Sequence, residues 1–280
     1  MTQDNHAPSM PALFVSHGSP DTAIADTKAA AWLKRLGAEL PRPRAIVVVS
    51  AHFEVTGGVM VSADPAPETI HDFGGFAPEL YAMQYPAPGE PELARRIVRD
   101  LQAAGFNSRA TPRRGFDHGV WVPLKLIYPA ADIPVVSVSV DPQQGPEHHY
   151  RVGQALSGLG AEGILVIGSG SFTHNLGEAF KALRVGQRDI DVPAWVNEFT
   201  GWMVDRLAEN DVAALIDYRR SAPHAQKNHP TDEHLLPLYV AMGAAGEGGR
   251  ATLAHDSAEC GVLAMTMWRF DTAASATRAA

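Results

Sequence analysis

The sequence predicts an α/β fold, with a central mixed, mainly parallel sheet and helices on both faces. Two observations predict it. Short runs rich in Val and Ile, without polar alternation, are typical of strands covered on both faces. Segments with helical spacing separate these runs, as in folds built around a parallel sheet. We expect the four strands at residues 12–16, 45–51, 134–140 and 163–168.

Helical spacing is clearest in five segments: 29–40, 90–104, 147–159, 193–209 and 231–244. Several of them begin with Pro or with an acidic first turn, as helices commonly do. Residues 58–63 and 261–269 are expected to be further strands, antiparallel at the edges of the sheet. Two segments, 68–76 and 114–121, mix His, Asp, Phe and Gly. We interpret them as loops that form the wall of a site.

The chain has 280 residues, of which 45% are hydrophobic, so it can bury a large core. Neither a repeat nor a linker divides it, and we expect a single domain over residues 10–270. Residues 1–9 and 271–280 are expected to form flexible termini. The chain shows neither an apolar run of about 18 residues nor a signal peptide, which predicts a cytoplasmic protein that does not enter the membrane.

Composition also restricts the partners and the ligands. The formal net charge of −8 argues against nucleic acid, because binding to phosphates needs clustered Lys and Arg. A small organic molecule is the expected partner, and both a monomer and a homodimer remain open. Cys260 is the single cysteine, which excludes an intrachain disulfide and a thiolate-rich metal site. Any bound metal must therefore be held by His, Asp and Glu.

Five of the twelve histidines stand at the ends of expected strands or helices: His17, His52, His118, His174 and His234. His17 and His52 each follow an apolar strand, and neighbouring parallel strands would bring both imidazoles to one edge of the sheet. A histidine metal site needs such convergence, because each neutral imidazole contributes one nitrogen. His174 would reach the same edge from a small-residue loop. His234 is expected in the first turn of a helix capped by Thr231.

Six short motifs occur in a defined order along the chain. They are His-Gly-Ser-Pro at 17–20, Ser-Ala-His at 50–52, Thr-Ile-His-Asp-Phe-Gly-Gly-Phe at 69–76, Gly-Phe-Asp-His-Gly at 115–119, His-Asn-Leu at 174–176 and Pro-Thr-Asp-Glu-His-Leu-Leu-Pro at 230–237. Together they resemble the DOPA dioxygenase branch of the class III extradiol ring-cleaving dioxygenases. The resemblance extends from about residue 11 to about residue 269.

This resemblance implies a non-haem metal site, functionally with Fe(II), and a catechol substrate whose ring is cleaved with O2. His17 and His52 would be two metal ligands, and the third would come from the pair Glu233 and His234. We favour His234, which matches the DOPA-type branch, and leave open whether Glu233 assists or replaces it. Three histidines also suit zinc, so the isolated protein can carry Zn(II) in place of iron.

The resemblance further implies that His174 is the acid/base histidine and that His118 lies near the substrate and oxygen. Four residues are expected to bind the substrate: His71, Asp72, Phe73 and Trp121. Phe76 and Phe116 are expected to add aromatic surface to the same wall.

Three other functions share part of this pattern. A tetrapyrrole chelatase also begins with a strand and a His-Gly-Ser turn, but it does not need the later Ser-Ala-His and Glu-His motifs. A zinc-dependent hydrolase would use Glu233 as the base for a metal-bound water. A catalytically silent metal-binding protein on the same scaffold would have no need of His118 and His174.

Overall fold

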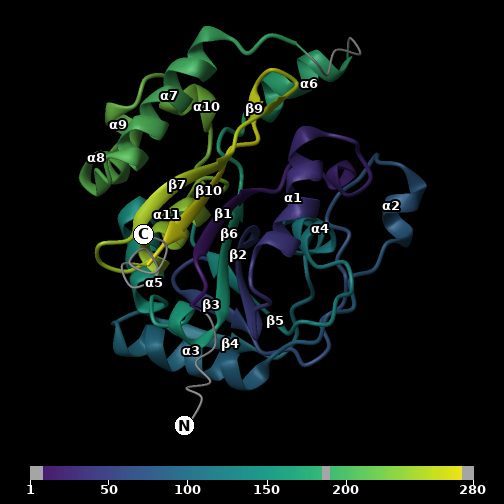
Figure 1. The fold of residues 1–280 in the computed structure, drawn as a ribbon, viewed down its shortest axis with the longest axis vertical. Helices are drawn as coiled ribbons and strands as arrows, with labels where there is room; N and C mark the ends of the chain where they lie inside the picture. Colours follow the sequence, from purple (N-terminus) through teal and green to yellow (C-terminus); the bar gives the residue numbers. More distant parts are fainter. Residues whose placement is uncertain (1–8, 185–189, 273–280) are drawn as a thin grey trace.

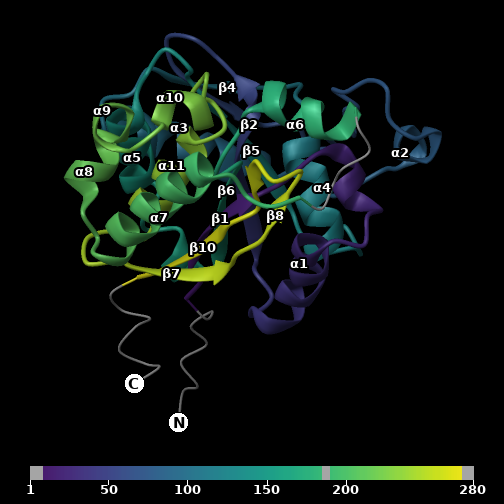
Figure 2. The ribbon, with the colours of Figure 1, turned by 90° about the horizontal axis from the view of Figure 1, so that it is seen from above.

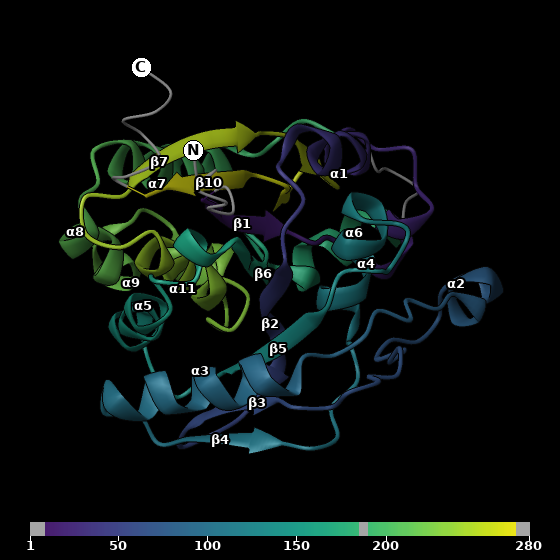
Figure 3. The ribbon, with the colours of Figure 1, turned by 60° about the horizontal axis from the view of Figure 1, so that its bottom comes forward.

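The structure, a computed structural model, describes residues 9–184 and 190–272. Its main sheet is formed by β1 (Ala12–Ser16), β2 (Ala45–Glu54), β3 (Val59–Ser62), β4 (Ser108–Thr111), β5 (Val135–Val140), β6 (Ile164–Gly170), β7 (Arg250–His255) and β10 (Met267–Asp271). Within the described residues this sheet has eight strands in the order β4-β3-β5-β2-β6-β1-β10-β7. Figure 3 shows that order from β4 at the bottom to β7 at the top.

The four strands that the sequence predicts form the centre of the sheet. β5, β2, β6 and β1 are neighbours and run parallel. β3 pairs antiparallel with β5, and β10 pairs antiparallel with β1, so the expected antiparallel pairing is confirmed. The strand expected at 261–269 begins only at Met267 in this sheet, and neither β3 nor β10 lies at its edge. The edges themselves are β4 and β7, which the sequence analysis missed. Both are partly or largely exposed to solvent, and they therefore lack the apolar run that marks a buried strand.

The helices of the described residues cover both faces of the sheet (Figure 1), as the sequence predicts. They are α1 (Lys28–Glu39), α2 (Pro78–Ala82), α3 (Pro91–Ala103), α4 (His118–Ile127), α5 (Pro146–Ala155), α6 (Leu176–Arg184), α7 (Ala194–Ala208), α8 (Val212–Ile216), α9 (Tyr218–Ser221), α10 (Ala225–Asn228) and α11 (Leu236–Ala244), with short 3-10 helices η1 (Pro20–Ala23) and η2 (Gly160–Glu162). In Figure 3, α1 and α4 lie on one side of the sheet and α5 and α11 on the other.

Alternating side chains of the central strands pack into two separate hydrophobic cores, one on each face of the sheet. On β2, Val47 and Val49 join the core beneath α5 and α11, whereas Ile46 and Val48 join the core beneath α1 and α4. All four valines and isoleucines are fully buried, because successive side chains of a strand point to opposite faces. The two cores extend from Met10 to Phe270 on this one sheet. This continuity supports our proposal of one domain over residues 10–270.

The expected helix 231–244 begins later than the sequence analysis places it. α11 starts at Leu236, and His234 lies in the turn before it rather than in a first helical turn capped by Thr231. Pro237 explains the difference, because a proline ring in a helix interior clashes with the carbonyl four residues earlier. Near the start of a helix the same ring is tolerated. His234 therefore belongs to a loop.

The segment 114–121, expected to be a loop, is partly helical. Asp117 is the N-cap of α4, and residues 118–121 form its first turn. Asp, His and Gly are typical of loops, so the composition of this segment does not indicate that a helix begins there. Two further strands, β8 (Ala258–Glu259) and β9 (Leu263–Ala264), form a hairpin that lies beside α6 in Figures 1 and 2.

The expected flexible termini fall mostly outside the described residues, which exclude 1–8 and 273–280. Asp271, expected in the C-terminal one, is the last residue of β10. Among the helices that the structure describes, none has the length and apolar character needed to span a lipid bilayer.

Candidate active site

Histidine side chains meet at the carboxyl ends of the parallel strands. His17 directly follows β1, and His52 lies near the end of β2. Nε2 of His52 lies 3.2 Å from Nε2 of His17 and 3.2 Å from Nε2 of His234. The structure thus brings together the three residues that the sequence analysis expects as metal ligands.

A local irregularity in β2 accompanies the position of His52. In the pairing of β2 with β5, the register shifts between Val49 and Glu54, so the stretch that contains His52 is out of regular pairing. Such bulges bend a strand and redirect its side chains, and they are common beside active sites. The strand expected at 45–51 consequently extends to Glu54 and includes the histidine.

Two glycines of β6 let the loop of His234 approach the sheet closely. A Cβ atom on Gly170 would lie 2.0 Å from the carbonyl oxygen of His234, and one on Gly168 would lie 2.1 Å from that of Pro237. The backbone amide of Ser171 donates to the same His234 carbonyl at 2.8 Å. His234 is therefore placed by direct contact between two backbones.

Hydrogen bonds determine which nitrogen of His17 carries the hydrogen. The Ser169 hydroxyl lies 3.0 Å from Nδ1 of His17 and also bonds the carbonyl oxygen of Gly119. A carbonyl can only accept, so the hydroxyl donates to Gly119 and its oxygen accepts from Nδ1–H of His17. Nε2 of His17 is therefore left with a lone pair that faces His52.

His234 is oriented in the same way by the residue before it. Oε1 of Glu233 lies 2.9 Å from Nδ1 of His234, and a carboxylate accepts, so Nδ1 carries the hydrogen. Nε2 of His234 consequently presents a second lone pair to His52. Metal-binding histidines commonly donate their other ring N–H to a carboxylate or to another acceptor.

The spacing of the three Nε2 atoms fits a single metal ion. Nitrogens about 2.0–2.1 Å from one metal lie about 2.9 Å apart at a right angle and about 3.4 Å apart at the tetrahedral angle. The two observed separations of 3.2 Å fall between these values. His52 has at most one hydrogen on Nε2 and cannot donate to both facing lone pairs. A cation between the three nitrogens would satisfy all of them.

Burial keeps the three imidazoles of the cluster in the neutral form that can bind a cation. It lowers the pKa of His52 to about 3, and it lowers the pKa values of His17 and His234 well below their ordinary value. Neighbouring histidines add to the effect in each case. All three imidazoles are therefore neutral near pH 7, which is the form that binds a metal.

Asp72 links His52 to the start of α4. Its Oδ1 accepts from the backbone amide of His118 at 2.9 Å and lies 3.0 Å from Nδ1 of that residue, while its Oδ2 lies 3.7 Å from Nδ1 of His52. The first amides of a helix have no partner within it, so this carboxylate satisfies one of them. Burial raises the pKa of Asp72, but its contacts with His118 outweigh burial and lower the pKa to about 2.

A buried carboxylate, Asp117, holds α4 against β2. Its Oδ1 accepts from the Ser50 hydroxyl at 2.6 Å, and its Oδ2 accepts from the Arg114 guanidinium at 2.7 Å. The same guanidinium donates to the backbone carbonyl of His52 at 3.2 Å. Burial raises the pKa of Asp117, although these two partners oppose the change. The network ties the backbone of His52 to the segment that carries His118.

His174 lies against the ring of His234, with ring centroids 3.4 Å apart and planes 15° apart. Its backbone amide donates to the carbonyl of Asn228 at 2.9 Å, which ties it to the end of α10. Burial lowers the pKa of His174 to about 4, while the nearby Glu233 opposes this. The ring is therefore neutral near pH 7 and can accept a proton.

The histidine cluster lines a cavity of about 830 Å³. His17, His52, His118, His174 and His234 all contribute to its wall. The remaining wall comes mainly from residues 18–24 after β1, from the loop 73–77, from α6 and from the β8–β9 hairpin. A cavity of this size suits a small-molecule ligand.

The expected substrate-binding residues occupy different positions. Phe73 lines the cavity, whereas His71 and Asp72 are not among the described residues of its wall. The ring of His71 is bonded through Nε2 to the carbonyl oxygen of Met83 at 3.0 Å. Asp72 contacts His52 and His118 instead of the cavity, so its geometry is that of a residue that orients both rings.

The expected aromatic wall is only partly formed. Phe76 lines the cavity, but Phe116 and Trp121 are fully buried in the core beneath α1 and α4. Trp121 donates through Nε1 to the carbonyl oxygen of Ile70 at 3.0 Å. The substrate contact expected of Trp121 is therefore corrected: its ring packs 6.3 Å from that of Phe73, inside the protein.

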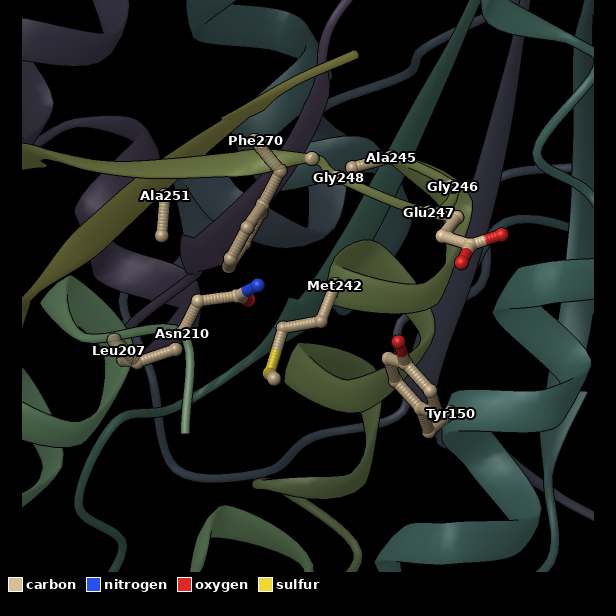
Figure 4. A pocket seen from close by; sticks show the side chains of 11 residues that line it. Tyr150, Leu207, Asn210, Met242, Ala245, Gly246, Glu247, Gly248, Ala251 and Phe270 are labelled. Carbon is tan, nitrogen blue, oxygen red and sulfur yellow. The ribbon is translucent and has the colours of Figure 1, made fainter. Parts of the chain in front are cut away.

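Figure 4 shows the side chains that line a second, smaller cavity of about 150 Å³. Its lining includes Tyr150, Met242 and Phe270, and Phe270 pairs with the first residue of β1. None of the described lining residues is a histidine. The candidate active site is therefore the larger cavity.

Comparison with known families agrees with this geometry. Residues 5–267 match the family described as the catalytic LigB subunit of aromatic ring-opening dioxygenase. The chain belongs to this LigB family. It is accordingly an enzyme, and it acts as an extradiol dioxygenase.

Individual relatives of this LigB chain match over most of their length. The 4,5-DOPA dioxygenase extradiol of Beta vulgaris is 41% identical and covers 92% of this chain and 95% of its own. The protein of the same name from Escherichia coli (strain K12) is 39% identical and covers 91% and 93%. A crystal structure of an uncharacterised Escherichia coli K12 protein has a TM-score of 0.76 and 34% identity, over 93% of this chain and 99% of its own.

In this LigB chain, Glu233 bonds the nitrogen of His234 that is not turned to His52. The carboxylate is therefore an orienting partner of His234 in this geometry. A hydrolase would need a base beside a metal-bound water, and the observed hydrogen bond occupies Glu233 elsewhere.

Sequence reasoning missed two groups of residues in the LigB site. Ser169, which orients His17, was hidden in a run of small residues, although its place at the carboxyl end of a parallel strand is a usable signal. Leu176 and Phe180 of α6 also line the cavity. The sequence gives no indication that these two residues line a cavity, because this part of the wall forms only when α6 packs against the β8–β9 hairpin.

Proposed function

We propose that this enzyme is a non-haem, metal-dependent dioxygenase that opens the ring of a catechol, DOPA-like or related, with O2. The convergence of three histidine Nε2 atoms on one wall of the large cavity carries the proposal. Three protein ligands leave room at a metal for both catechol oxygens and for O2. Relatives named 4,5-DOPA dioxygenase extradiol support the substrate class.

The proposed ligands are His17, His52 and His234, with Ser169 and Glu233 as the acceptors that orient two of them. A bound metal would acidify a catechol hydroxyl and supply the redox chemistry that O2 requires. Iron(II) meets both requirements, whereas zinc has no redox chemistry. Zinc nevertheless binds imidazole well, so recombinant protein can carry it.

His174 is the proposed acid–base residue. Its neutral ring lines the cavity beside His234, where it can take a proton from a catechol hydroxyl and later return it to the ring-opened product. His118 lies beside His52 with ring centroids 3.9 Å apart and can hydrogen-bond a substrate oxygen. Phe73 and Phe76, whose rings are 5.4 Å apart, would pack against the aromatic substrate.

Oxygen uptake tests the proposed reaction. Protein loaded with iron(II), and separately with zinc, is assayed with a panel of catechols in an oxygen electrode. We expect oxygen consumption and a yellow ring-opened product with the iron form alone. Absence of uptake with every catechol would refute a catechol dioxygenase.

His174→Ala tests the division of roles. We expect its metal content to stay near that of the wild type while kcat falls by about 10²–10⁴-fold, the usual contribution of acid–base catalysis. His224→Ala is the matched control, because His224 is exposed and pairs with Glu198 at 2.9 Å. Loss of metal from His174→Ala would identify His174 as a ligand instead.

A further inference from the structure

The cavity is much larger than a catechol requires. A catechol has eight non-hydrogen atoms and fills roughly 160 Å³ at the packing density of a protein interior. The cavity measures about 830 Å³, so the catechol would occupy about a fifth of it. Cavities of roughly 300–1,000 Å³ usually bury most of a drug-sized ligand. The cavity therefore has room for a substituent much larger than the catechol ring itself.

Exposed apolar side chains gather around this cavity. Among the described residues, the large hydrophobic side chains that are exposed are Ile24, Tyr81, Leu176, Phe180 and Leu253. Ile24, Leu176 and Phe180 line the cavity, and the ring of Tyr81 lies 5.2 Å from that of Phe73 in its wall. Single exposed apolar residues are ordinary, but a group of them marks a binding surface.

Helix α6 extends the apolar surface away from the proposed acid–base residue. Leu176 lies two residues after His174, and Phe180 follows one helical turn later on the same face. Ala179 lines the cavity between them, and Leu263 of the β8–β9 hairpin joins the wall beside them. A ring held at the histidines would thus have a continuous apolar surface next to its substituent.

We propose that the substrate is a catechol whose ring carries an extended apolar substituent, which Leu176 and Phe180 bind. The inference rests on the proposed function, because the histidine cluster places the catechol end. Burial of one methylene changes affinity by about fourfold. Leu176 and Phe180 are 42% and 50% exposed, so we expect about half of that free energy, or about twofold per methylene.

Binding without oxygen tests the inference independently of turnover. Metal-loaded wild-type protein is titrated anaerobically with 4-ethylcatechol, 4-butylcatechol, 4-hexylcatechol and DOPA, and Kd is measured by calorimetry. We expect Kd to fall about tenfold or more from the ethyl to the hexyl compound. A Kd that does not depend on chain length, or tighter binding of DOPA than of 4-hexylcatechol, would overturn the proposal.

Variants test the assigned residues. In Leu176→Ser/Phe180→Ser, the ratio of the ethyl and hexyl Kd values should fall below about threefold. Leu253→Ser is the matched control, since Leu253 is 41% exposed and lies on β7 outside the cavity, and it should keep the wild-type ratio. A wild-type ratio in the double variant would overturn the assignment. So would a change in its association state, which would identify the surface as a contact between two copies.

Oxygen uptake with the same catechols separates this inference from the proposed function. Binding that depends on chain length, without uptake by the iron(II) form, would refute the proposed function and leave the apolar site standing. Uptake together with a Kd independent of chain length would refute the apolar site alone.

Discussion

Gly170→Ala should damage the active site by moving His234. An alanine Cβ at this position would lie 2.0 Å from the carbonyl oxygen of His234, whereas real Cβ atoms essentially never approach closer than 3.0 Å. The two backbones must therefore separate by the difference, which is at least about 1 Å. Neither partner can yield by rotating a side chain, because the contact is with backbone and Gly170 belongs to a central strand.

The size of the expected effect follows from this displacement. Misplacing a catalytic group by about 1 Å can cost about 10² in rate, so we expect kcat/KM to fall by about 100-fold or more. Metal affinity should fall as well, because His234 is a proposed ligand. Overpacking a well-packed site costs about 1–3 kcal/mol, so Tm should also decrease.

Metal analysis, oxygen uptake with a catechol and thermal unfolding measure these effects. Gly201→Ala is the matched control, since Gly201 lies inside α7 and an added Cβ meets nothing within 4 Å. Alanine favours a helix interior by about 1 kcal/mol over glycine, so this variant should keep wild-type kinetics and an equal or higher Tm. Wild-type metal content and kcat/KM in Gly170→Ala would refute the placement of His234 by this contact.

Three further predictions concern the metal and pH. Ser169→Ala removes the acceptor of Nδ1–H of His17 and should weaken iron(II) binding by about 10–100-fold in a chelator competition; unchanged binding would contradict the assigned tautomer. A chelator should lower Tm, since metal at 100 times its Kd stabilises the folded state by about 2.7 kcal/mol, and an insensitive Tm would argue against a bound metal. Burial lowers the pKa of His149 from 6.5 to about 4, so its contribution to stability is present above pH 6.5 and is lost as the pH falls toward 4. His149→Gln should therefore lower the free energy of unfolding near pH 8, and this loss should be about 3 kcal/mol smaller near pH 4 in denaturant titrations. A loss that does not vary with pH would be the contrary result.

Elements whose pattern reflects burial on both faces could be predicted from the sequence. β1, β2, β5 and β6 are rich in buried apolar residues, and each lies in the centre of the sheet. The edge strands β4 and β7 could not be predicted in this way, because exposed strands carry polar residues that resemble loops. The start of α4 was missed for a related reason, since Asp117 and His118 are typical loop residues until Asp72 satisfies the helix amide.

The sequence by itself determined the fold class, the family and the set of histidines at the site. These follow from local patterns and from the order of short motifs, both of which can be read without knowing any distance in the folded protein. The tertiary structure alone decided how the histidines act together. His52 and His234 are 182 residues apart in the chain, yet their Nε2 atoms lie 3.2 Å apart. Contacts in the folded chain decide which nitrogen of His234 bonds Glu233, where the hydrogen lies on His17 and which apolar surface α6 presents. Hydrogen bonds and burial are set by neighbours in space.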